Sequence, residues 1–472
     1  MFSKIKEECG IFGIYSKDKD AELAPLTCVG LSCLQHRGEE SCGIAINDGG
    51  LIYCEKDIGL VADVFRPEIL SKLPTGKMSI GHVRYSTTGA PRKENAQPIV
   101  KRYSKGNICV VHNGNLTNTE ELRNELEEHG AIFNSTSDTE VICSIIARER
   151  VKTDSIEEAV KNATKYLKGA YSLLVMSSRK LVAVRDPYGF RPLCMGKMGD
   201  DYVFASESCA LDVVGATFER DIKPGEIVTI FNDEITTDNF RTNEKDGLCI
   251  FEYVYFSRPD SNIDGMNVHK FRELAGKYLA EQAPVEADFV AGVPDSGLDA
   301  ALGYSKYSKI PYDIAFVKNK YIGRTFIQST QAKRRNQVAL KLNPIPSTVK
   351  DKRIILIDDS IVRGTTITRI IKTLRRAGAK EIHLRIASPA FLGVCYFGTD
   401  VTNKDGLIAT KKTVEEIRQE IGADSLEYLS LENLRKIAEG SNMKGFCEGC
   451  FTGKYPIDVP DEIQKDKFEK VF

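Results

Sequence analysis

Residues 9 to about 231 alternate between short apolar runs and turns that contain Gly, Asn or Asp. Eight of these runs have the composition of β-strands: IFGIY, CGIAI, LIYCE, CVVHN, YSLLVM, LVAVRD, YVFAS and IVTIF. Two stretches with helical spacing, 118–129 and 138–151, interrupt them, and the acidic Asp138 can cap the second helix. The pattern predicts stacked antiparallel sheets with helices on the outside.

From about residue 288 the pattern changes. Apolar runs (DFVAGV, DIAFV, RIILID and EIHLRIAS) alternate with helices such as 366–377, which ends at Gly378. This alternation predicts an α/β domain with a parallel sheet. Thr413 and Glu416 form a capping box for a helix that ends before Gly422. The change falls in the polar stretch 232–247, so we assign residues 9–235 to one domain and 236–472 to a second.

Composition and charge exclude several classes of protein. A chain of 472 residues with 42% hydrophobic and 28% charged residues is typical of a globular protein with a full core. A net charge of −1 argues against a general nucleic-acid binder, and no apolar run approaches the roughly 20 residues of a membrane span. Residues 1–8 lack the apolar segment of a secretory signal. We therefore expect a cytoplasmic protein whose thirteen cysteines are reduced thiols, metal ligands or catalytic groups.

Cys9, in the segment CGIFG, lies behind only eight residues. If residues 1–8 are a propeptide, its removal makes Cys9 the first residue of the mature chain. A terminal cysteine combines a nucleophilic thiolate with an α-amino group whose ordinary pKa is roughly 7.7–8.0 and which can act as the base. The alternative is a small buried cysteine at the start of a strand.

Three polar clusters supply partners for such a nucleophile: HVRYST (82–87), HNGN (112–115) and SDTE (137–140). Arg84 can clamp an α-carboxylate and Asp138 can receive an ammonium group. Asn113 and the Gly114 N–H can form an oxyanion hole. With Cys9 these residues make a complete acyl-transfer site for glutamine. We interpret His36, His82 and His112 as hydrogen-bonded structural groups near it.

The run RIILID leads into Asp358 and Asp359, then into a small-residue turn and a helix. Ligands of parallel sheets bind at the carboxyl ends of strands, and the turn 363–366 offers backbone N–H groups to a phosphate. The turn lacks the Gly-Lys-Ser/Thr ending of a Walker A loop. The acidic pair suits ribose hydroxyls and Mg²⁺; the alternative is a solvated acidic loop.

A third group consists of Cys447 and Cys450, in a CxxC pair, with Cys249 and Cys395 far away in the sequence. Such a pair binds metal or forms a redox disulfide; the alternative is a CxxC turn together with two buried thiols. Spacing leaves zinc and iron–sulfur open, because both accept four thiolates.

Taken in this order, the motifs resemble the amidophosphoribosyltransferase family, which joins a class II glutamine amidotransferase to a type I phosphoribosyltransferase. LQHRGEES (34–41), FEYVYFSRPD (251–260) and NKYIGRTF (319–326) strengthen the resemblance, which runs from Cys9 to about Tyr455. It implies an N-terminal nucleophile (Ntn) hydrolase sandwich (αββα) followed by a phosphoribosyltransferase domain. Glu39 and Cys42 depart from the Gln and Ala of many relatives.

The resemblance also implies roles for particular residues. Those that would bind 5-phosphoribosyl-1-pyrophosphate (PRPP) are Asp358, Asp359, Ser360, Arg363, Gly364, Thr365 and Thr366. Ser296, in VPDSG (293–297), would contact Mg²⁺ together with the acidic pair. The propeptide-bearing branch carries a [4Fe–4S] cluster, whose ligands would be Cys249, Cys395, Cys447 and Cys450. The basic segment 317–342 would form a lid over pyrophosphate.

The implied reaction uses ammonia from glutamine to displace pyrophosphate from PRPP, which gives 5-phosphoribosylamine, the first committed step of purine synthesis. Inhibitory purine nucleotides and a homotetramer or dimer are expected with it. One alternative is another class II amidotransferase, against which the Asp358–Asp359 element argues. The other is a non-catalytic PRPP-sensing regulator, against which the intact Cys9, Arg84 and Asp138 argue.

Overall fold

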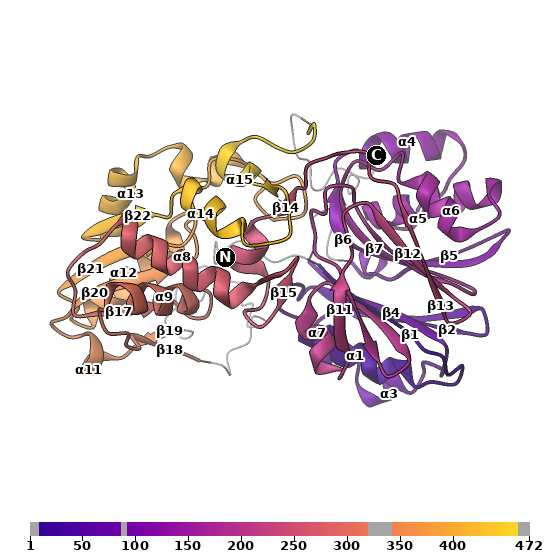
Figure 1. Cartoon of the computed structure of the whole chain (residues 1–472), viewed down its shortest axis with the longest axis horizontal. Helices are drawn as coiled ribbons and strands as arrows, with labels where there is room; N and C mark the ends of the chain where they lie inside the picture. Colours follow the sequence, from indigo (N-terminus) through magenta and orange to yellow (C-terminus); the bar gives the residue numbers. More distant parts are fainter. Residues whose placement is uncertain (1–8, 86–91, 320–341, 461–472) are drawn as a thin grey trace.

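The computed structural model describes residues 9–85, 92–319 and 342–460, which form two lobes that lie side by side (Figure 1). The expected propeptide, residues 1–8, lies outside the described residues, and so does most of the expected lid, residues 320–341. No helix in the described ranges is long and apolar enough to cross a membrane.

The first lobe contains two antiparallel sheets. One has the strand order β11-β9-β10-β1-β4-β2-β3 and the other has the order β13-β12-β8-β7-β6-β5. The strands of the first sheet are β1 (Gly10–Tyr15), β2 (Ser41–Asp48), β3 (Leu51–Ile58), β4 (Met78–Arg84), β9 (Cys194–Met198), β10 (Asp201–Ala205) and β11 (Thr217–Asp221). The strands of the second are β5 (Ile99–Tyr103), β6 (Gly106–Leu116), β7 (Gly169–Ser177), β8 (Leu181–Arg185), β12 (Glu226–Phe231) and β13 (Glu234–Asn239).

Helices cover the outer faces of both sheets (Figure 1). On the first sheet these are α1 (Leu23–Cys33), α2 (Val61–Val64), α3 (Pro67–Leu70) and α7 (Ser208–Val213). On the second they are α4 (Thr119–Glu128), α5 (Asp138–Lys152) and α6 (Ile156–Ala163); η1 (Lys93–Asn95) is a single 3₁₀ turn. Ile11, Ile80, Val111 and Leu174 belong to one apolar cluster between the sheets. The expected αββα sandwich is confirmed.

The second lobe is built on a parallel sheet of order β17-β20-β21-β22. Its strands are β17 (Phe289–Gly292), β20 (Arg353–Asp358), β21 (Glu381–Ile386) and β22 (Ser425–Tyr428). Along β20, Ile355 and Ile357 pack with α8 (Val268–Gln282) and α9 (Leu298–Ser308), whereas Ile354 and Leu356 pack with α12 (Thr365–Arg376) and α13 (Val414–Ile421). Helices therefore bury both faces of the sheet, which explains the unbroken apolar run of this strand.

Short elements complete this lobe. The strands are β14 (Leu248–Cys249), β15 (Asn262–Ile263), β16 (Met266–Asn267), β18 (Phe316–Lys318), β19 (Leu342–Pro344) and β23 (Phe446–Cys447). The helical elements are the π-helical turn η2 (Glu252–Phe256), the 3₁₀ turns η3 (Lys404–Gly406) and η4 (Ile408–Thr410), and α11 (Pro346–Val349), α14 (Leu431–Ala438) and α15 (Gly449–Thr452). Strand β13 lies in the polar stretch 232–247, across the expected domain boundary at 235/236.

Most expected elements are confirmed: the eight strands expected in the first domain, the helices near 118–129, 138–151 and 366–377, and the capping box at Thr413. Two expectations need correction. The run DIAFV meets the parallel sheet only at its start, where the Asp313 N–H donates to the Val290 carbonyl of β17 at 3.0 Å beside a parallel bridge from Tyr312 to Val290. Its later residues belong to β18, which pairs antiparallel with β19. Asp138 does not cap α5; the Ser137 hydroxyl does so by accepting from the Thr139 N–H.

Candidate functional site

Cys9 directly precedes β1, in the middle of the first sheet, and only 6% of its surface is exposed. Its thiol donates to the carbonyl of Tyr85 at 3.4 Å. Nε of the fully buried Arg37 donates to the Cys9 carbonyl oxygen at 2.9 Å. The carbonyl and the thiol of Cys9 are therefore both held, and Cys9 lies near the end of β4 that carries Arg84.

Arg84, at the end of strand β4, lies near enough to Asp138, at the start of helix α5, for its charge to act on that carboxylate. Nη1 of Arg84 donates to Glu40 at 2.9 Å, and the Asp138 carboxylate accepts from the Leu116 N–H at 3.2 Å. Burial acts to raise the pKa of Asp138, but His112, the Leu116 N–H and Arg84 together hold that pKa below its usual range. The site thus contains a fixed cation and a fixed carboxylate, the two groups that recognise the ends of an α-amino acid.

The strand β6 supplies Asn113 and Gly114. Nδ2 of Asn113 donates to the Ser206 hydroxyl at 3.4 Å, and the same hydroxyl accepts from the Ile11 N–H at 3.0 Å. Ser206 therefore joins the candidate oxyanion-hole amide to the strand that follows Cys9. At Gly114 a Cβ would lie 2.1 Å from the Ala170 oxygen, so this position requires glycine. The neighbouring His82 and His112 are buried and hydrogen-bonded, as expected.

The acidic pair lies at the carboxyl end of β20. Asp358 and Asp359 are each only 2% exposed, and the Asp359 N–H donates to Oδ1 of Asp358 at 3.0 Å. The hydroxyl of Ser296 donates to one Asp359 oxygen, and the Ser360 hydroxyl donates to the other at 2.5 Å. Ser296 is therefore brought to the acidic pair from a different loop. Buried carboxylates next to hydroxyls form a set of hard oxygen donors, which suits Mg²⁺.

The turn after this pair opens helix α12. Gly364 has a left-handed backbone (φ 76°) and stands at the helix N-cap position, with Thr365 as the first helical residue. The Thr366 hydroxyl is buried and has no hydrogen-bond partner in the part of the chain that the structure describes. Arg363 is exposed and lies beside Gly406. Backbone N–H groups at a helix start, together with an unpartnered hydroxyl, are donors of the kind that suit a phosphate.

The VPDSG loop (293–297) follows β17 and lies beside β20. The Val293 N–H donates to the Ile357 carbonyl at 2.8 Å, and a Cβ on Gly297 would lie 2.4 Å from that same oxygen. The Pro294–Asp295 peptide bond is cis. Asp295 pairs with Lys318, which is a described residue of the expected lid.

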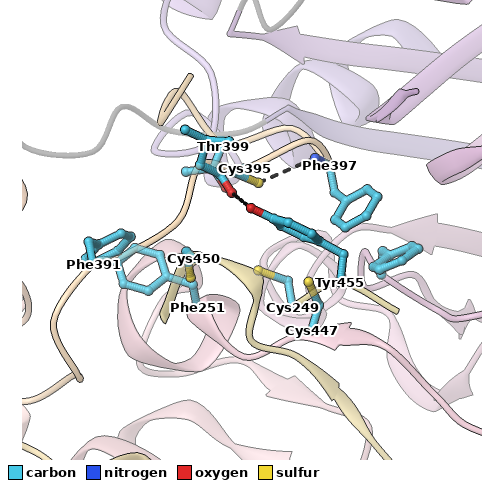
Figure 2. A pocket seen from close by; sticks show the side chains of 11 residues that line it. Cys249, Phe251, Phe391, Cys395, Phe397, Thr399, Cys447, Cys450 and Tyr455 are labelled. Carbon is cyan, nitrogen blue, oxygen red and sulfur yellow. Dashed lines mark hydrogen bonds between the residues drawn. The ribbon is translucent and has the colours of Figure 1, made fainter. Parts of the chain in front are cut away.

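The four cysteines 249, 395, 447 and 450 line one pocket with aromatic side chains (Figure 2). Cys249 and Cys447 are paired residues of β14 and β23, and Cys450 belongs to α15. Burial raises the pKa of the Cys447 thiol to about 12 and raises that of Cys450 well above its usual range, and neighbouring thiols add to both rises. The Phe397 N–H donates to the Cys395 sulfur at 3.4 Å. Residues that are distant in sequence thus form one thiol-rich, apolar pocket.

Four cysteine thiols from different parts of the chain form the donor set of this pocket. A zinc ion and a [4Fe–4S] cluster both accept four thiolates, so the residues present fit either group. Within the described ranges, the structure contains no group of three or more His, Cys, Asp or Glu side chains placed to hold a metal ion.

A buried ionic network, which the sequence did not predict, joins the two lobes. Arg37 donates to Glu207 at 2.7 Å and to both oxygens of Glu252 at 2.8 and 2.9 Å. Arg191 also reaches Glu252, at 3.2 Å, and donates to the Phe397 carbonyl. The two lobes therefore meet through the same arginine that holds the Cys9 carbonyl. The only sequence signal was that Arg37 and Glu252 both belong to family-like motifs.

Comparison with known proteins decides the identity of the chain. Residues 82–213 match the glutamine amidotransferase domain family, and residues 266–387 match the phosphoribosyl transferase domain family. The amidophosphoribosyltransferase of Methanocaldococcus jannaschii is 49% identical, and the alignment covers 98% of this chain and 99% of that protein. The Bacillus subtilis enzyme is 47% identical over 97% of each chain. The chain belongs to the amidophosphoribosyltransferase family.

Solved structures agree with this assignment. A glutamine PRPP amidotransferase from B. subtilis, complexed with ADP and GMP, has a TM-score of 0.90 and 46% identity, and covers 97% of this chain and 99% of its own. A second structure, described as the allosteric regulatory enzyme of purine biosynthesis, has a TM-score of 0.91 and 45% identity over 98% of this chain and 99% of its own. The chain is thus a glutamine-dependent pentosyltransferase that makes 5-phosphoribosylamine in purine biosynthesis. Neither alternative function is supported.

Proposed function

We propose that the first domain, residues 9–235, hydrolyses glutamine with Cys9 as an N-terminal nucleophile after residues 1–8 are removed. Three groups support this role: Arg84 for the α-carboxylate, Asp138 for the ammonium group, and Asn113 with Gly114 for the oxyanion. The thiolate attacks the side-chain amide and ammonia leaves. Water then hydrolyses the thioester to glutamate. The hydrogen bonds that link Asn113 through Ser206 to Ile11, close to the buried Cys9, are the observation that carries the proposal.

Intact-mass measurement tests the processing step. Before cleavage the nitrogen of Cys9 belongs to a peptide bond and cannot act as a base. We expect purified active enzyme to begin at Cys9, and glutaminase activity to rise in proportion to the cleaved fraction. Full glutaminase activity in protein that retains Met1–Glu8 would overturn the proposal.

The second domain, residues 236–472, takes Mg·PRPP at the acidic pair. The four residues 363–366 hold the 5-phosphate, and Asp358 and Asp359 hold the ribose and Mg²⁺ together with Ser296. The Ser296–Asp359 hydrogen bond and the unpartnered Thr366 hydroxyl support this assignment. When bound, Mg²⁺ neutralises charge on the departing pyrophosphate. Asp359→Asn should abolish PRPP binding measured by titration calorimetry, whereas Asp313→Asn, at an exposed site, should not. Unchanged binding by Asp359→Asn would refute the assignment.

A [4Fe–4S] cluster held by Cys249, Cys395, Cys447 and Cys450 is the proposed resident of the thiol pocket. When bound, it cross-links the interdomain segment, the loop after β21 and the C-terminal region. Anaerobically purified protein should contain four iron atoms per chain and be brown. Cys447→Ser should lose the iron, whereas Cys28→Ser, on helix α1, should keep it. Fully active protein that contains zinc, or no metal, would contradict the cluster assignment.

Regulation, assembly and location complete the proposal. The related B. subtilis structure contains ADP and GMP, so we expect purine nucleotides to inhibit this enzyme; an absence of inhibition by both would contradict this. A homotetramer or dimer is expected and is measurable by light scattering. Because we expect the thirteen cysteines of the sequence to be reduced thiols, cluster ligands or catalytic groups, we expect the enzyme in the reducing cytoplasm.

A further inference from the structure

Two cysteines outside the thiol pocket face each other beside the junction of the lobes. Cys33 is the last residue of α1, and Cys209 is the second residue of α7. Their sulfurs are 3.7 Å apart, and the Cys33 thiol also approaches the Cys209 carbonyl at 3.3 Å. A disulfide needs sulfurs roughly 2.0 Å apart, so closing this gap takes a movement of about 1.7 Å. Both residues are at helix ends, where small shifts disrupt few hydrogen bonds.

The surroundings make these two thiols unequal. Nη1 of Arg258, from the second domain, donates to the Cys33 sulfur at 3.4 Å. The Cys209 thiol bond, Arg258 and His36 lower the pKa of Cys33. The bond to Cys33, burial and Glu207 raise the pKa of Cys209. Cys33 is therefore the more acidic of the two thiols and Cys209 the less acidic one, as expected for an attacking and a resolving cysteine.

Solvent reaches the pair from one side. The side chains of Arg258 and His36 are 41% and 26% exposed, and Cys33 itself is 9% exposed. Cys209 is only 3% exposed. A small oxidant can therefore reach Cys33 before it reaches Cys209.

We propose that Cys33 and Cys209 form an oxidative modification site that closes to a disulfide when the enzyme meets a peroxide. The Cys33 thiolate attacks one peroxide oxygen, the O–O bond breaks, and a sulfenic acid forms as hydroxide leaves. The Cys209 sulfur then attacks the sulfenic sulfur and loses its proton, and the oxygen of the sulfenic acid leaves as water. In total two thiols and one hydrogen peroxide give one disulfide and two water molecules.

The functional consequence rests on the proposed role of Cys9. The Cys209 thiol lies 3.8 Å from the Glu207 carboxylate, which binds Arg37, and Arg37 holds the Cys9 carbonyl. Drawing Cys209 toward α1 moves the start of α7 beside Glu207. Glutamine-dependent turnover should then fall, whereas turnover with added ammonia, at the second site, should not.

Peptide mapping under non-reducing conditions tests the site without reference to activity. The Cys28→Ser variant is the working background, because tryptic fragment 20–37 contains Cys28 as well as Cys33, whereas fragment 198–220 contains Cys209 alone. After limited hydrogen peroxide we expect these fragments to be linked, with a mass below their sum by two hydrogens. In the unmodified sequence the link should form faster than Cys28 is oxidised, because burial raises the pKa of the Cys28 thiol whereas the Cys209 thiol and Arg258 lower that of Cys33.

Variants complete the design. In Cys209→Ser, Cys33 should stop at a sulfenic acid that a cyclic dione traps. Cys33→Ser should retain glutamine-dependent activity under a peroxide dose that reversibly halves the parent's activity. Peroxide products on Cys33 without the link, or faster oxidation of Cys28, would overturn the modification site. A mapped link with unchanged glutamine turnover would overturn its coupling to Glu207. If Cys9→Ala still used glutamine, the proposed role of Cys9 would be wrong, but the disulfide between Cys33 and Cys209 found by peptide mapping would still stand.

Discussion

Glu252 is the buried carboxylate on which the junction of the two lobes depends. It is fully buried and accepts hydrogen bonds from Arg37, Arg191 and Ser257. Burial acts to raise its pKa, but the two arginines lower that pKa from 4.5 to about 2. At about 1.4 kcal/mol per pH unit, this difference amounts to ~3 kcal/mol of stability. Removing one partner of a buried ion pair typically costs 3–5 kcal/mol, which agrees.

We therefore expect Glu252→Gln to lower the free energy of the first urea-induced unfolding transition by about 3 kcal/mol at pH 7. Because the folded pKa lies below the unfolded one, the ionised carboxylate stabilises the fold fully above pH 4.5, and its contribution is lost as the pH falls toward 2. The variant should approach the parent's stability in that acid range. Glu415→Gln is the matched control: the bond from Arg418 lowers the pKa of Glu415 also to about 2, but Glu415 is exposed. Equal stability of both variants at pH 7 would refute the reasoning.

Three further predictions concern single groups. Burial lowers the pKa of His82 from 6.5 to about 3, so between these pH values only the unfolded chain binds a proton at this histidine. The free energy of unfolding should therefore fall by about 1.4 kcal/mol per pH unit as the pH drops below 6.5. Urea titrations of His82→Gln should show a smaller dependence on pH. Thr366→Val should weaken PRPP binding about tenfold in calorimetry without lowering the stability of the ligand-free protein, since its hydroxyl has no partner among the described residues. Ser206→Ala should lower kcat with glutamine about tenfold and spare the ammonia reaction, because it loosens Asn113; equal loss in both assays would contradict this role.

Features that depend on residues adjacent in the sequence, such as the end of a strand, were predicted most accurately. Asp358 and Asp359 follow four apolar residues, so their position at a strand end was readable without a structure. The strand β4 was not predicted although it carries Arg84, because its sequence MSIGHVR mixes apolar, small and charged residues. All of these side chains are buried, and a strand covered on both faces loses the alternation that marks strands in a sequence.

Partnerships across the lobes could not be predicted in the same way. Arg37 and Glu252 are separated by 215 residues, and no periodic pattern links them. A carboxylate in a sequence motif could pair with many of the chain's Lys and Arg side chains, and only the packing of the two domains determines which one it contacts. The same holds for the start of helix α5. Ser and Asp are both good caps, so the sequence does not decide between Ser137 and Asp138. In the structure Ser137 caps the helix, and the Asp138 carboxylate points toward the Leu116 N–H and His112.

The central claim is that Cys9 produces ammonia at one site and the Asp358–Asp359 pair consumes it at another. Pyrophosphate release from Mg·PRPP, measured with glutamine and then with ammonium chloride, tests this most directly in Cys9→Ala and Asp359→Asn. The account predicts that Cys9→Ala loses the glutamine reaction and keeps the ammonia reaction, whereas Asp359→Asn loses both. Glutamine-dependent release by Cys9→Ala, or normal release by Asp359→Asn with either nitrogen source, would contradict it.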